Sequence, residues 1–187
     1  MKTITRFALA AALLTAPFAF ADEEAAPEGG GTGMRRSGYL LDASPQDRPM
    51  LLSVHAVLPY GYLGVGYGFP FGVGATFYIP IVKNGFIPPV NDEFGIDFGA
   101  DATLHFGYSN IFSLSVPVSV LWTFHITDKF AAFAKLGVAL RIWPGWLTPV
   151  YASPVSVVGI NYMFSKSFGI RAEVGYPMVK FGVLFAF

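Results

Sequence analysis

The sequence predicts an all-β fold, an eight-stranded antiparallel transmembrane up-and-down β-barrel. Three observations lead to this prediction. Apolar residues recur at every second position through most of residues 50–187, charged side chains keep to the opposite face of each such segment, and the chain ends on an aromatic residue, Phe187. Alternation with a period of two residues is typical of strands whose two faces meet different surroundings. Helices are therefore not expected in this region.

The composition of the chain favours contact with lipid. Of the 187 residues, 53% are hydrophobic and only 13% are charged, with 12 basic and 12 acidic side chains. An average soluble domain has about 25% charged residues. A disordered chain or a nucleic-acid-binding chain is thus not expected. The chain has no cysteine, which excludes disulfides and thiolate metal sites.

Residues 1–21 have the features of a secretory signal peptide. Lys2 and Arg6 precede an apolar stretch over residues 7–20, and the segment ends in the small-residue pattern Ala19-Phe20-Ala21. The apolar stretch is shorter than the roughly 20 residues of a membrane-spanning helix. We expect cleavage after Ala21.

Residues 22–49 are predicted to form a flexible N-terminal tail. The segment is rich in Glu, Ala, Pro and Gly, and it contains the run Glu28-Gly29-Gly30-Gly31-Thr32-Gly33. A segment of this composition cannot bury enough apolar surface to fold alone.

The barrel is predicted to occupy residues 50–187. The clearest strands cover 94–108 and 111–126, which are joined by a tight turn at Ser109-Asn110. The glycine-rich end of the first strand is equally readable as a loop. An even number of strands suits a single-chain bacterial barrel. The predicted strands cover residues 51–65, 72–82, 94–108, 111–126, 130–143, 152–164, 168–175 and 178–187.

Seven charged residues in the predicted strands lie on the less apolar face, which is otherwise rich in Gly, Ser and Ala. They are Asp97, Asp101, Lys135, Arg141, Arg171, Glu173 and Lys180. The other charged residues after position 49 are predicted in connections, at Lys83, Asp92, Glu93, Asp128, Lys129 and Lys166. A Lys or Arg facing lipid at the bilayer midplane costs about 2–4 kcal/mol. The bulky apolar face is thus expected to meet lipid, and the charged face to line the lumen.

An eight-stranded barrel has an interior that side chains just fill. Unpaired charges would be costly there, so we expect the acidic and basic side chains to pair in a lumen charge network. An open pore is not expected. A narrow gated channel remains an alternative.

The last eight residues, KFGVLFAF, carry a resemblance to a known family. Lys180, Gly182, Phe185 and Phe187 stand in a pattern similar to the C-terminal signal of bacterial outer-membrane β-barrels, which the barrel-assembly machinery reads. Residues 94–187 resemble small OmpA/OmpX-type barrels. The resemblance implies a location in the bacterial outer membrane, contact with its lipid, and a periplasmic position for Phe187. The tail would then be periplasmic, and residues 22–48 are a possible site for a periplasmic partner.

This orientation predicts two aromatic rims. The periplasmic rim would hold Phe94, Ile126, Phe130, Phe164 and Phe168, and the outer rim would hold Tyr108, Trp143, Trp146, Tyr151 and Tyr176.

A structural or interaction role is predicted rather than an enzyme, with no catalytic residue, cofactor or metal site. Because some eight-stranded outer-membrane barrels are enzymes that act on lipid A, a lipid A hydrolase or acyltransferase is the alternative. His55, His105 and His125 fall on the inward face, and His105 is near the outer end, with Ser109 and Ser153 as conceivable neighbours. No nucleophile motif surrounds those serines, and no phosphate-binding loop is present. An inward His105 far from any serine would remove the main enzyme candidate.

Overall fold

The computed structural model describes residues 40–41, 48–59, 69–106, 111–144 and 150–187. The chain divides into two compact units, residues 1–34 and 35–187, and every described residue belongs to the second. Within the described ranges, no helix has the length and apolar character needed to cross a membrane.

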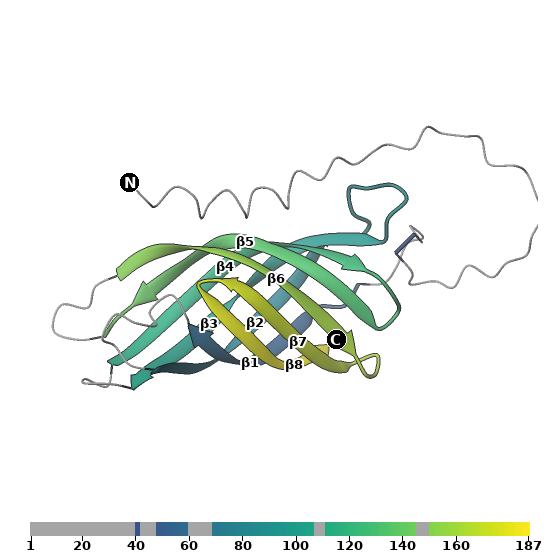
Figure 1. Cartoon of the computed structure of the whole chain (residues 1–187). Helices are drawn as coiled ribbons and strands as arrows, with labels where there is room; N and C mark the ends of the chain where they lie inside the picture. Colours follow the sequence, from purple (N-terminus) through teal and green to yellow (C-terminus); the bar gives the residue numbers. More distant parts are fainter. Residues whose placement is uncertain (1–39, 42–47, 60–68, 107–110, 145–149) are drawn as a thin grey trace, which may run out of the picture. The chain divides into compact units, whose positions relative to one another are not determined.

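The second unit is a closed barrel in which each strand pairs antiparallel with the next and β8 pairs with β1 (Figure 1). The fold class predicted from the sequence is confirmed. Predicted and observed bounds differ mainly at β1, since positions 60–65 of the predicted first strand lie outside the described residues. The strands are β1 (Leu51–Pro59), β2 (Phe69–Val82), β3 (Asp92–Phe106), β4 (Ile111–His125), β5 (Phe130–Ile142), β6 (Val150–Met163), β7 (Phe168–Tyr176) and β8 (Met178–Ala186).

The two faces of the barrel wall have opposite character, as β5 illustrates. Lys135 and Arg141 are buried in the interior, whereas the alternate residues Leu136, Val138 and Leu140 are 61%, 55% and 51% exposed. A soluble barrel has its apolar face inside and its charges in water. Here the bulky aliphatic side chains form the outer surface, and the polar side chains line the lumen.

The interior also holds a cluster of bulky apolar residues that the sequence analysis did not predict. Tyr78, Leu121 and Phe133 pack together in the lumen, with Leu51 against them. Glycines on neighbouring strands make room for the two rings, since a Cβ at Gly95 would strike Tyr78 and a Cβ at Gly159 would strike Phe133. Small residues on one strand therefore make room for large residues on the neighbouring strand.

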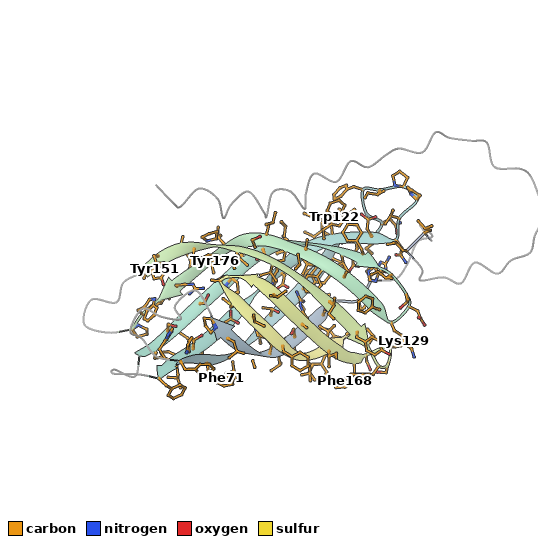
Figure 2. The ribbon with its side chains drawn as sticks, viewed as in Figure 1. Phe71, Trp122, Lys129, Tyr151, Phe168 and Tyr176 are labelled. Atoms are coloured by element: carbon orange, nitrogen blue, oxygen red, sulfur yellow. The ribbon has the colours of Figure 1, made fainter. Side chains whose placement is uncertain are left out.

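The β7–β8 hairpin is shorter than the strands beside it. Tyr176, at the end of β7, pairs with Ser156, whereas β6 begins six positions further out, at Val150. Six residues of strand correspond to about 20 Å. Figure 1 shows the yellow hairpin ending well short of the end of β6. The predicted place of Tyr176 in the outer rim is therefore wrong, while Tyr151 does lie near that end (Figure 2).

Two acidic residues predicted in a connection, Asp92 and Glu93, instead begin β3 and are buried. Asp92 lies on the outward face of β3 but is only 1% exposed. Its carboxylate accepts hydrogen bonds from Trp122 Nε1 at 2.7 Å and from the Phe86 backbone N–H at 3.2 Å. The connection between β2 and β3 therefore folds over this carboxylate and shields it. Glu93 points the opposite way, into the lumen.

Candidate functional site: the barrel lumen

Four of the predicted charges form a compact cluster in the middle of the lumen. Arg171 lies between two carboxylates, with Nη2 2.6 Å from Asp97 Oδ2 and Nε 2.7 Å from Glu173 Oε1. Lys135 Nζ donates to Glu173 Oε2 at 2.8 Å and lies 3.6 Å from Asp97 Oδ2. Two acidic and two basic groups balance one another, which offsets much of the cost of burying each charge.

The Phe133 ring links this cluster to the apolar one. The Arg171 guanidinium carbon lies 4.5 Å from the centre of the Phe133 ring. A guanidinium over an aromatic face is stabilised by the ring's quadrupole. Charged and apolar side chains thus fill the middle of the barrel together.

A second group surrounds Asp101. Lys180 Nζ donates to both carboxylate oxygens, at 3.0 and 2.9 Å, and His55 Nε2 lies 2.9 Å from Asp101 Oδ1. All three side chains are buried. A Cβ at Gly74 would strike the Asp101 carboxylate, so the glycine provides the space for this group. The sequence analysis predicted Asp101 and Lys180 as network members but did not include His55.

Arg141 lies apart from the carboxylates of these two groups. Its Nε donates to Ser153 Oγ at 3.2 Å, and the side chain is buried. The structure therefore brings together six of the seven predicted charges in two groups and places Arg141 apart from both.

A third group, at the Phe187 end, was missed by the sequence analysis. Glu93 Oε2 lies 3.4 Å from Arg48 Nε, and Glu93 Oε1 lies 3.4 Å from His125 Nε2. Arg48 also donates to Asn91 Oδ1 and, at 3.3 Å, to the Lys83 carbonyl. Arg48 was assigned to the tail. The signal that could have identified Glu93 is its position four residues before Asp97, on the same face of β3.

The histidine proposed as the main enzyme candidate does have a serine neighbour. His105 Nε2 lies 3.4 Å from Ser113 Oγ, across the β3–β4 pair. Ser109 lies outside the described residues, and Ser153 accepts from Arg141 instead. An inward His105 far from any serine would have removed the enzyme candidate. Because Ser113 lies beside His105, the candidate stays.

Trp143 contacts an inward-facing residue of β3. Its ring centre lies 5.0 Å from that of His105, and its Nε1 donates to Tyr151 Oη at 2.9 Å. The prediction that Trp143 belongs to a lipid-facing rim thus needs correction. Tyr108 and Trp146 lie outside the described residues.

The four residues of the C-terminal signal occupy different surroundings in β8 and just after it. Lys180 points into the lumen, and Gly182 allows close packing against His55. Phe185 lies outside, with its ring centre 5.6 Å from that of Phe168, and the terminal Phe187 ring lies 5.8 Å from Phe77. Figure 2 shows Phe168 and Lys129 at the end where Figure 1 marks the C-terminus.

No group of three or more His, Cys, Asp or Glu side chains suited to a metal ion occurs among the described residues.

No protein-family model and no curated protein matches this chain. Solved structures similar to it include the Yersinia pestis outer membrane protein Ail in a phospholipid bilayer nanodisc, at 14% identity and a TM-score of 0.48, covering 75% of this chain and 100% of Ail. The N-terminal β-barrel domain of Pseudomonas aeruginosa OprF is similar at 10% identity and a TM-score of 0.44, covering 74% and 96%. A crystal structure of Yersinia pestis Ail, the attachment invasion locus protein, with the heparin analogue sucrose octasulfate matches at 16% identity and a TM-score of 0.40, covering 73% and 97%.

Proposed function

We propose that this protein is an integral barrel of the bacterial outer membrane with a filled, polar lumen and a structural or interaction role. The observation that carries the proposal is the distribution of side chains across the wall. Large apolar residues are exposed outside on all eight strands, while six charged side chains of the barrel interior are buried in ion pairs. Only a lipid environment makes this arrangement favourable.

The same distribution argues against a continuous water-filled path. The cluster of Tyr78, Leu121 and Phe133 and the adjacent ion pairs occupy the lumen between its ends. Small barrels of eight strands are filled by side chains in this way. In this proposal, the filled lumen does not carry a steady ion current.

Two experiments test these statements separately. Cell fractionation with heat-modifiable gel migration should place the protein in the outer-membrane fraction and show a fast-migrating folded form in unheated samples. Recovery in the soluble periplasmic fraction would contradict the membrane assignment. Planar-bilayer recordings of the purified protein should give no steady conductance. A steady, ion-selective current would instead support the narrow gated channel.

The partners in this proposal are outer-membrane lipid, the barrel-assembly machinery through the C-terminal signal, and a periplasmic protein through residues 22–48. Deletion of residues 22–39 tests the last of these, because it retains Leu40 and Arg48, both of which contact Asn91. Loss of a co-purifying periplasmic protein from the folded deletion variant would support this partner. Unchanged co-purification would exclude residues 22–39 as the binding segment.

A second candidate function is lipid hydrolysis or acyl transfer, favoured by the 3.4 Å separation of His105 Nε2 and Ser113 Oγ. A histidine base beside a serine nucleophile is the arrangement such chemistry needs, usually at 2.6–3.2 Å. Labelling by a fluorophosphonate probe that is lost in Ser113→Ala and retained in Ser153→Ala would support it. An unlabelled folded barrel, with unchanged lipid A after overexpression, would contradict it.

A further inference from the structure

The lumen opens at the Phe187 end into a cavity that no function discussed above uses. Its volume is about 310 Å³, and its walls come from the ends of several strands and from the turns that follow β4 and β6. Leu51 lies both in this wall and against the Tyr78, Leu121 and Phe133 cluster. The cavity is thus a cup, closed on the inner side by that apolar cluster.

The wall of the cup combines apolar and charged side chains. Leu51 and Ala186 supply apolar surface. Glu93 contributes a carboxylate, but Arg48 and His125 already lie beside its two oxygens. The wall therefore offers hydrophobic contact with little uncompensated negative charge.

Asn161 adds a polar group that the protein leaves unsatisfied. The side chain lines the cavity, the residue is only 6% exposed, and its Oδ1 has no hydrogen-bond partner. A buried acceptor without a donor costs free energy that a ligand N–H could restore. Because χ2 of asparagine has a broad torsional minimum, rotation can turn this oxygen toward a bound group.

The rim of the cup carries positive charge on ordered turns. Lys129 and Lys166 lie in its lining with one acidic neighbour, Asp128. The Thr127 hydroxyl accepts hydrogen bonds from the backbone N–H groups of Lys129 and Phe130, at 3.2 and 2.9 Å. These bonds stabilise the turn that follows β4. An anionic group at the rim would lie near the ammonium groups of two exposed lysines.

We propose that this cup binds the C-terminal end of a peptide whose last residue is aliphatic. The aliphatic side chain packs on Leu51, the last peptide N–H donates to Asn161 Oδ1, and the terminal carboxylate lies near Lys129 and Lys166. In the β5–β6 pair, Asn161 is opposite Ala131, two positions from Lys129. Two strand residues span about 7 Å, the length of an extended dipeptide.

The test uses the full mature chain in lipid nanodiscs, with N-acetyl-Ala-Leu as the probe and its C-terminal amide as the matched control ligand. Binding is followed by NMR titration of the barrel amides. The acid is expected to bind with a Kd in the millimolar range or below, at least about fivefold more tightly than the amide, and to shift signals from residues around Asn161. No binding of the acid, or equal affinity for the amide, would overturn the proposal.

Variants test the two polar contacts. Asn161→Leu should weaken binding of the acid by about tenfold or more, because it removes the acceptor and fills part of the cavity. Lys129→Gln with Lys166→Gln, on exposed turns, should abolish the preference for the acid, while Ser153→Ala near the other end should change nothing. An unchanged preference for the acid in the lysine double variant would also overturn the proposal. The titration measures binding alone, so it is independent of the fractionation that tests the outer-membrane assignment.

Discussion

Arg171 and Asp97 join opposite sides of the barrel. Arg171 belongs to β7 and Asp97 to β3, four strands away in a closed ring of eight, and 74 positions separate them in the chain. Arg171 Nη2 nevertheless donates to Asp97 Oδ2 at 2.6 Å. This ion pair connects β3 and β7 across the lumen.

Removal of the Arg171–Asp97 ion pair should strongly destabilise the folded barrel. Arg171→Met leaves Asp97 and Glu173 buried with only Lys135 between them, and breaking a buried ion pair typically costs about 3–5 kcal/mol. Urea unfolding in detergent micelles, followed by tryptophan fluorescence, measures the loss. Lys166→Met, at an exposed turn, should change the free energy of unfolding by no more than about 0.5 kcal/mol. A similar small effect in Arg171→Met would show that the cluster contributes little to stability.

Added volume at Gly74 should disturb the group around Asp101. A Cβ there would meet the Asp101 carboxylate and the His55 ring, so Gly74→Ala must displace both. Overpacking of this kind costs about 1–3 kcal/mol. The neighbouring Ala75 faces outward, and Ala75→Val should be close to neutral in the same unfolding assay. Equal stability of the two variants would rule out a tight fit at Gly74.

Phe187 should matter more for assembly in cells than for stability. Phe187→Ala removes one ring contact with Phe77 at the barrel end, which predicts a loss of about 1 kcal/mol in detergent. If the C-terminal aromatic is read during assembly, the amount of folded protein in the outer membrane should fall severalfold. Phe86→Ala, which also removes one aromatic contact, is the control. A parallel fall in both variants would assign the effect to packing alone.

Arg48 should fasten the segment before β1 to the barrel end without supporting the barrel itself. Arg48→Ala removes contacts to Asn91, Glu93 and the Lys83 carbonyl. Limited proteolysis should then cut before Met50 at a rate several times that of the parent, while the urea midpoint shifts by less than the shift caused by Arg171→Met. Slow cleavage equal to that of the parent would show that other contacts hold the segment.

The alternation of side chains allowed the faces of the strands to be predicted because burial in a sheet repeats every two residues. The inward positions of Asp97, Lys135 and Arg171 follow from that period. The ion-pair partners of these residues cannot be predicted in the same way. The period shows which face of a strand a side chain occupies, but not which distant strand lies across the lumen from it. The split into two groups, with Arg141 apart from both, depends on strand register and barrel closure.

Other features escaped prediction because they break the alternation or lie beyond it. Asp92 lies on the outward face, which is unfavourable until a connection covers it. Tyr78 and Phe133 are large residues on a face expected to be small, and they fit only because glycines face them across neighbouring strands. Arg48 contacts the barrel from a segment whose composition predicts no structure.

The short β7–β8 hairpin makes the hydrophobic thickness of the protein uneven around its circumference. Nine strand residues inclined by about 40° rise roughly 23 Å along the membrane normal, against about 39 Å for the fifteen residues of β3. Lipids beside Tyr176 therefore meet a lower wall than lipids beside β3. A bilayer adapts to such mismatch by local thinning, or the protein tilts, at a fraction of a kcal/mol per ångström.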